Sequence, residues 1–492
     1  MHQDKIINTK HLSGFLAFVG LLGIAMGIIS QDFYIPLIIL ITPFALIFIM
    51  KSLEKPIYLM YFIFTFGYFF LTMSRYFHLE GKSYLFDIII WSTLIVCIMH
   101  SVIRHNIGWH RLKNFLIFSL IIWFIYCFME LANPNSNFEN WYRARSLMYN
   151  FLFMAALSQL LITQIKQVKT IVLLFSIFTL VAIIKSYIQK YIGFDATELE
   201  WLSDPHVHSL NFLSGGVVRY FSIFSDAGVC GSMMGATAAW FGITGLYEKN
   251  RTKKIYFFII AIGSVFGMLF SGTRGAIICP IGAIGLFAIV SKNKKLMITS
   301  GIMLVIIYSF LAFTFIGHNV TYIRRLRTAV RPTQDASFNV RIENQKRLAR
   351  YLKSKPFGVG LRGDIKTSQT DNRAIPSDSY YVLIWISTGI VGLILFLASA
   401  IITIIIASYI IMFKIKNKEL KELLIGPICA TFGLLLSSYT NIIWGQFPVF
   451  VIIYIFWGII FNYKIIDKNL TKQKNIKKLN NNSYGNTFFT NE

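Results

Sequence analysis

Long apolar runs separated by short polar segments make up most of this chain. A run of about 18 or more apolar residues can cross the hydrocarbon core of a bilayer as a helix. The run at 380–413 exceeds one span, so we expect it to begin with a short re-entrant or interfacial piece. The pattern predicts an all-α polytopic membrane protein with about 12–14 transmembrane helices. The fourteen runs are 12–30, 33–50, 56–74, 85–103, 115–132, 148–165, 168–188, 222–246, 255–271, 275–291, 297–317, 380–413, 422–441 and 445–463.

Composition agrees with this interpretation. The 492 residues are 55% hydrophobic and 14% charged, whereas about 25% are charged in a typical soluble domain. This excludes a soluble enzyme, a disordered regulator and a disulfide scaffold. The 5 cysteines lie in or beside apolar runs, so we expect no disulfide framework and no zinc site. We expect a transmembrane domain over 1–463, a loop inserted at 318–378, and a basic, disordered tail at 464–492.

The net charge of +25 is unevenly distributed between the loops. With a cytoplasmic N-terminus, the basic loops fall on one side of the membrane, with one exception. The positive-inside rule then predicts cytoplasmic termini and an even number of spans. Membrane topology and sites for phosphate-bearing ligands account for the charge, so we expect no nucleic-acid partner. The basic segments are 1–11, 51–55, 104–114, 247–254, 292–296, 414–421 and the tail from 464.

The longest connection, residues 318–378, is basic although this topology places it outside. It holds 13 Lys and Arg against 5 Asp and Glu. Long loops translocate largely regardless of charge, so the topology stands. Arg outnumbers Lys, and the planar Arg fork matches phosphate or carboxylate. A solvated loop without a ligand is the alternative, but a site for an anionic substrate explains the composition better. Within the loop, Asn339–Leu352 predicts an amphipathic helix that ends before Lys355-Pro356.

Three positions at span boundaries carry charged groups that are costly near a bilayer. Arg219 precedes a span that starts with Ser225-Asp226. Arg274 lies in the short turn Ser271-Gly272-Thr273-Arg274-Gly275, whose backbone N–H groups favour an anion. Asp378 lies where the inserted loop leads back into the membrane, and it is a candidate general base.

Each of these residues also has a structural interpretation. Arg219 can simply extend its charge to the membrane interface. Arg274 can act as a topological anchor. Asp378 can cap a helix, with Ser377 and Ser379 as rival caps.

Taken in order, these residues resemble the O-antigen ligase and polymerase superfamily of bacterial envelope glycosyltransferases. The resemblance covers roughly residues 200–445 and includes Ser271-Gly272-Thr273-Arg274-Gly275-Ala276, then Arg341 and Gly358-Val359-Gly360 in a large loop. Arg347 and Gly358 also fit the Arg-x10-Gly spacing of polymerases. Asp378-Ser379-Tyr380-Tyr381 stands where ligases show His-Asn-x-Tyr, and the absent His favours polymerase.

The resemblance implies an inverting glycosyl transfer without a metal or other cofactor, at the periplasmic face of the bacterial inner membrane. It implies that Arg219 and Arg274 neutralise a leaving diphosphate and that Asp378 takes the proton. The expected partners are a glycan on undecaprenyl diphosphate, the lipid bilayer and a chain-length regulator. The acceptor is a second lipid-linked repeat unit for a polymerase, or lipid A-core for a ligase. The expected substrate-binding residues are Arg341, Arg347, Gly358, Gly360, Ser271, Thr273 and Tyr381.

Two alternatives stay open at this point. A transporter for lipid-linked sugars is a rival from another class, and it predicts internal repeats that the sequence does not show. Separately, Tyr142, Arg143 and Arg145 in an outer loop either contact sugars or belong to an interfacial aromatic belt.

Overall fold

The computed structural model describes residues 45–77, 82–212, 218–317, 319–328, 336–362 and 379–472. These residues form an all-α bundle, and no strand occurs among them beyond one isolated bridge between Phe212 and Val218. Nine helices in the described part are long and apolar enough to cross a membrane, or ten if a bent pair near the C-terminus counts as one span. The all-α polytopic prediction is therefore confirmed. The first predicted run, 12–30, lies outside the described residues, as does most of the second.

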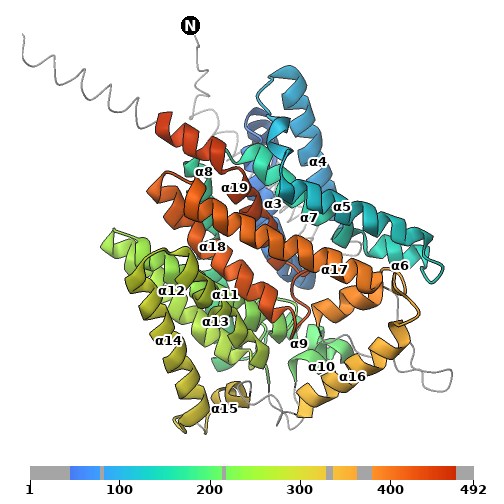
Figure 1. Ribbon diagram of the computed structural model, residues 1–492, viewed down its shortest axis with the longest axis vertical. Coiled ribbons are helices and arrows are strands. Elements are labelled where there is room, and N and C mark those ends of the chain that lie inside the picture. The colour runs from blue at the N-terminus through green and yellow to red at the C-terminus, as the bar shows by residue number, and fades with distance from the viewer. Residues whose placement is uncertain are drawn as a thin grey trace, which may run out of the picture.

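The long helices form the body of the bundle (Figure 1). They are α3 (Ile57–Tyr76), α4 (Lys82–Ile103), α5 (Phe115–Met129), α8 (Ile165–Tyr191), α11 (Ala227–Tyr247), α12 (Arg251–Phe270), α14 (Lys294–Phe313), α17 (Tyr380–Tyr409) and α18 (Lys418–Ser437).

Three predicted spans are shorter helices: α7 (Arg145–Leu161), α13 (Ile278–Val290) and α19 (Val449–Phe461). At 1.5 Å per residue, the 13 residues of α19 reach only about 20 Å, less than a bilayer core of about 30 Å. All but the last of its residues are buried, so it is a central helix with protein on every side. The connection 438–448 before it is non-helical and includes the fully buried Ile443 and Trp444. Irregular backbone at membrane depth is tolerated where protein surrounds it.

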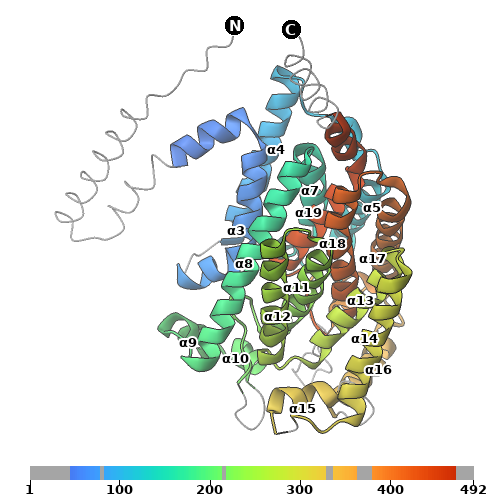
Figure 2. The same ribbon diagram turned by 90° about the vertical axis from the view of Figure 1, so that its left-hand side faces the viewer.

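The two ends of the bundle differ (Figure 2). Short helices cover one end, called the capped end below. They are α6 (Phe138–Arg143), α9 (Ala196–Ser203), α10 (Pro205–Asn211), α15 (Thr321–Thr328) and α16 (Ala336–Leu352). The basic connections 104–114, 248–250, 291–293 and 415–417 lie at the opposite end, called the basic end. This separation agrees with the charge pattern from which the topology was predicted.

Two helices confirm details of the sequence pattern. The amphipathic helix expected in the inserted loop is α16, which buries Leu348 and Leu352 against Val382 and Ile386 of α17. Helix α17 is interrupted at Gly389 (φ 65°, ψ −171°), so a short first piece precedes the main span, as its excess length predicted.

The tail departs from expectation over its first part. Residues 463–472 are helical and meet α19 at 59°, with Ile466 and Leu470 buried. The predicted disorder from 464 is therefore wrong for this stretch, because these two apolar side chains pack on the bundle. The rest of the tail lies outside the described residues.

Candidate functional site

The turn that carries Arg274 connects α12 to a 3-10 segment, Arg274–Ile277, and then to α13. Gly272 has φ +58°, a conformation that side chains disfavour. Buried Ser271 donates to the Met268 carbonyl at 2.7 Å and accepts from the Thr273 backbone N–H at 3.2 Å. The turn is thus held by its own hydroxyl groups, and half-buried Arg274 follows directly.

Gly275 is the point where this turn contacts the rest of the site. A Cβ at Gly275 would lie 2.5 Å from Cβ of Thr440, in the connection between α18 and α19. Ser437 also donates to the Gly275 carbonyl at 3.2 Å. Only glycine permits this approach.

Arg219 lies beside the turn and uses its guanidinium to hold it. Nη2 donates to Oγ1 of Thr273 at 2.7 Å, Nε to the Ser271 carbonyl at 3.1 Å, and Nη1 to the Leu210 carbonyl at 2.7 Å. Burial lowers the pKa of Arg219, Asp226 opposes this, and the positive charges of Arg341 and Arg274 add to it. Three cationic side chains therefore lie close together, and Arg219 donates to three protein acceptors.

Asp226, the acidic residue of the Ser-Asp turn, caps α11. Its Oδ1 accepts from the backbone N–H groups of Gly228 at 2.7 Å and Val229 at 3.1 Å. Buried Asn211 supports the same connection, because its Oδ1 accepts from the Ala227 N–H at 2.9 Å. The turn is therefore explained by helix capping.

Sequence reasoning missed a partly buried polar network that supports this connection. Lys185 Nζ lies 2.8 Å from Oδ2 of Asp195 and 3.1 Å from Oε1 of Glu198. Gln189 donates to Glu198 at 2.6 Å and accepts from the Ser222 backbone N–H at 2.7 Å. Two signals were present: a lysine inside an apolar run and an Asp-x-x-Glu capping box at 195–198.

The inserted loop brings one arginine to this place. Arg341 of α16 donates from Nη1 to the Thr440 carbonyl at 3.1 Å. Arg347 lies on the exposed side of the same helix, where its Nε is 3.5 Å from Oε1 of Glu343. The structure therefore brings Arg341 to the turn of Arg274 and leaves Arg347 apart from it.

The start of α17 lies at the same connection. Ser379 Oγ accepts from the Tyr381 backbone N–H, so Ser379 is the helix cap. It donates to the Ser438 carbonyl at 3.2 Å, and the Tyr380 N–H donates to the same carbonyl at 3.0 Å. The Tyr381 hydroxyl donates to the Leu435 carbonyl, a structural contact. Asp378, the predicted base, lies outside the described residues, although Ser379 directly follows it in sequence.

The Gly-x-Gly turn has a packing role elsewhere on α17. Gly358 (φ +76°) faces the break in α17, where a Cβ would lie 2.5 Å from the Gly389 nitrogen. Gly360 (φ +87°) packs on Ser136 of the connection between α5 and α6. These close backbone contacts account for both glycines.

The elements converge on Ser437–Asn441, which sequence analysis placed inside the predicted span 422–441. Helix α18 ends at Ser437, and the polar run Ser-Ser-Tyr-Thr-Asn was the signal for that earlier end. Arg274 and Arg341 add positive charge beside it. Such a site suits an anion at the membrane face. Among the described residues, no group of three or more His, Cys, Asp or Glu has a metal-site arrangement.

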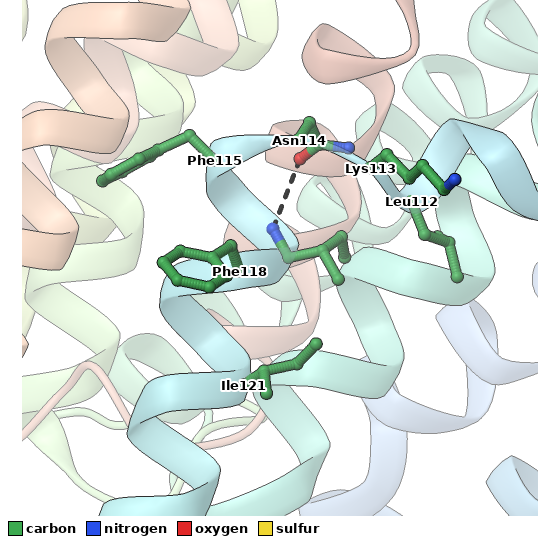
Figure 3. A pocket seen from close by; sticks show the side chains of 7 residues that line it. Leu112, Lys113, Asn114, Phe115, Phe118 and Ile121 are labelled. Atoms are coloured by element: carbon green, nitrogen blue, oxygen red, sulfur yellow. Dashed lines mark hydrogen bonds between the residues drawn. The ribbon is translucent and has the colours of Figure 1, made fainter.

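A groove on the side of α5 is separate from this site. It has a volume of about 420 Å³ and lies at the basic end, where Asn114 caps α5 by accepting from the Ile117 N–H at 3.3 Å (Figure 3). Its wall includes Phe115, Phe118 and Ile121. None of the candidate site residues lines it.

Residues 256–397 match a family model described as O-antigen ligase. The matched segment contains the Arg274 turn, the inserted loop with Arg341, and the start of α17. No curated protein matches the chain.

Proposed function

Because residues 256–397 match a family model described as O-antigen ligase, we propose that the chain is a polymerase of the O-antigen ligase and polymerase superfamily, which joins undecaprenyl-diphosphate-linked oligosaccharide repeat units into a surface polysaccharide. The product is an O-antigen, a capsule or an exopolysaccharide. The reaction takes place at the capped end, which is the periplasmic face of the bacterial inner membrane. Both termini are then cytoplasmic.

The observation that carries the proposal is the meeting of three segments at Ser437–Asn441. Gly275 packs on Thr440, Arg341 donates to the Thr440 carbonyl, and Ser379 donates to the Ser438 carbonyl. A tight arginine turn, an arginine from a loop of the capped end and the residue after Asp378 thus contact one short connection. A scaffold protein has no need of this arrangement.

The chemistry follows from the charges. An acceptor hydroxyl oxygen attacks the anomeric carbon of the donor sugar, and the bond from that carbon to the diphosphate oxygen breaks. The electron pair leaves with the diphosphate, whose added charge Arg274 and Arg341 stabilise. Asp378 takes the proton of the acceptor hydroxyl. Arg219 holds Thr273 and the turn, so we assign it a positioning role in place of direct contact.

A lipid-linked donor also needs an apolar surface below the charged site. A groove of about 320 Å³ lies between α13, α17 and α18. Its lining is mostly apolar and includes Leu435 of α18 and Phe413, which follows α17. Leu435 is two residues from Ser437, and its carbonyl accepts a hydrogen bond from the Tyr381 hydroxyl. The groove therefore begins near the charged site and continues toward the basic end, as a polyprenyl chain in the bilayer requires.

A ligase is the second candidate, because the matching family model carries that description. In a ligase, the same arginines bind the same donor, and lipid A-core supplies the attacking hydroxyl. A chain-length regulator is a proposed partner only for the polymerase.

Complementation of a deletion strain tests the proposal. Wild type, Arg274→Ala, Asp378→Ala and the control Arg347→Ala are expressed at matched levels, and surface glycan and lipid-linked intermediates are separated on gels. A polymerase predicts single-repeat glycan on lipid A-core in the deletion strain. A ligase predicts bare lipid A-core with long polymer left on the carrier. Normal glycan with both Arg274→Ala and Asp378→Ala contradicts the proposed site.

A further inference from the structure

We propose that the exposed rings of Tyr84, Phe138 and Tyr142 form a binding surface for sugar residues of the acceptor glycan. This surface, called the ring platform below, combines the start of α4 with α6 at the capped end. The inference rests on the proposed glycosyl transfer, because that reaction requires a second glycan beside the donor.

The three rings are exposed and adjacent. Their exposed fractions are 46% for Tyr84, 66% for Phe138 and 39% for Tyr142. The rings of Phe138 and Tyr142 are 6.2 Å apart and nearly parallel at 14°, and those of Tyr142 and Tyr84 are 6.4 Å apart. Together they present an apolar surface several rings wide.

The ring platform is held in place by an ion pair beneath it. Arg145 lies over the rings of Tyr84 at 4.3 Å and Tyr142 at 4.9 Å, and its Nε is 2.9 Å from Oδ2 of Asp87. Cation–π contacts and a largely buried ion pair hold the rings of Tyr84 and Tyr142 in place, and Phe138 stacks on Tyr142. An aromatic belt needs only rings at the right depth and has no need of this restraint.

Polar groups border the rings. Arg143 and Glu139 are exposed, with Nη2 and Oε1 2.5 Å apart. Arg362 of the inserted loop is close by. Burial lowers its pKa, and the nearby positive charges of Arg143 and Arg145 lower it further. A pyranose has the matching character: its C–H face packs on an aromatic ring, and its hydroxyls bond to charged side chains at the edge.

The position also fits an acceptor. Gly445 packs against both Leu147, two residues after Arg145, and Tyr380 at the start of α17. Arg341, Thr440 and Ser438 approach that helix start from other elements. An inverting displacement needs the attacking hydroxyl opposite the leaving diphosphate. The ring platform is thus linked to the start of α17 through Leu147 and Gly445, whereas Arg341 reaches the same connection through Thr440.

The test is saturation-transfer NMR on the purified full-length protein in detergent. The probe is the oligosaccharide repeat released by mild acid from the surface glycan of the source strain, free of lipid and phosphate. We expect transfer to sugar protons with wild type and with Arg274→Ala. The double variant Phe138→Leu/Tyr142→Leu is expected to bind about two- to tenfold more weakly per ring removed.

The matched control is Trp91→Leu, which removes a ring 45% exposed two turns further along α4. It should bind like wild type. Three results would overturn the ring platform: no transfer with wild type, unchanged binding by the double variant, or an equal loss with Trp91→Leu. The last result would indicate a membrane belt.

In cells, the double variant should give shorter glycan, whereas Arg274→Ala should give none. Normal glycan with Arg274→Ala would contradict the proposed function, while the NMR result would still show whether the ring platform binds the oligosaccharide.

Discussion

Arg219 donates a hydrogen bond from Nη2 to Oγ1 of Thr273 at 2.7 Å, and this contact links the connection before α11 to the turn after α12. The other two guanidinium nitrogens of Arg219, Nε and Nη1, donate to the carbonyls of Ser271 and Leu210. The contact separates two roles that the sequence had assigned together. Arg219 positions the turn, and Arg274 is presented by it.

Thr273→Val should weaken this link while keeping the shape of the side chain. The variant removes the acceptor of Arg219 and the donor to the Ala227 carbonyl at 2.7 Å, so we expect a loss of about 1–3 kcal/mol of stability and reduced glycan synthesis. Thermal unfolding in detergent and glycan gels measure the two effects. Adding Arg219→Met should cost less than the sum of the single changes, because both remove the same bond. Strict additivity would show that the two residues act independently.

Gly275→Ala should inactivate the protein by pushing the arginine turn away from Thr440. The new Cβ would meet Oγ1, Cβ and Cγ2 of Thr440, a contact that no rotamer relieves, since Cβ itself is 2.5 Å away. We expect loss of glycan synthesis and a lower unfolding temperature. Gly285→Ala, on α13 with open space around it, is the control and should be close to wild type.

A second change tests the cause. Gly275→Ala combined with Thr440→Gly removes the clashing atoms and should recover part of the lost stability. If the pair is no more stable than Gly275→Ala alone, the contact with Thr440 is not what requires glycine.

Asp195 should make stability sensitive to acid. Burial alone would raise its pKa, but hydrogen bonds from Lys185 and Tyr76 outweigh burial and lower the pKa to about 2. A lowered folded-state pKa means that the stabilisation is complete above the unfolded value of about 3.9 and is lost as the pH falls towards 2. Asp195→Asn, which keeps the helix cap, should therefore be less stable than wild type at pH 7.

The difference between wild type and Asp195→Asn should narrow as the pH drops below about 4. Unfolding temperatures measured from pH 7 to pH 3 check this. A difference that stays constant over the whole range would mean that the charge of Asp195 does not contribute.

The sequence predicted the helices well because the length and polarity of apolar runs are local properties. It was least accurate at α13 and α19, whose apolar sequences look like spans although the helices are short. Protein surrounds α19, so its length need not match the bilayer, whereas α13 is preceded by the 3-10 segment Arg274–Ile277, which takes up the start of the apolar run. The end of α18 at Ser437 was missed for the same reason, since a buried polar connection is hidden between two apolar runs.

Within the site, the motif positions were predictable, but their roles depended on distances that sequence does not contain. Arg341 and Arg347 are six residues apart in one helix, and only the packing of α16 on α17 decides which of them reaches Thr440. Gly358 and Gly360 were predicted to bind substrate, and that stays a prediction; the structure adds their close packing on Ile386, Gly389 and Ser136, which the sequence could not give.

Arg341→Ala and Arg347→Ala form a matched pair that tests the assignment of the inserted loop. In the proposed reaction, Arg341 adds positive charge where the diphosphate leaves, and loss of one such group costs about 100- to 1000-fold in rate. Arg347 makes an exposed pair with Glu343 within one helix, worth only about 0.2–0.5 kcal/mol. We therefore expect Arg341→Ala to abolish long glycan and Arg347→Ala to leave it unchanged at equal protein levels. Arg341→Lys should recover little, because a lysine cannot reproduce the planar fork. Equal defects in both alanine variants would mean that the basic character of α16 matters as a whole, and the specific role of Arg341 at Thr440 would be wrong.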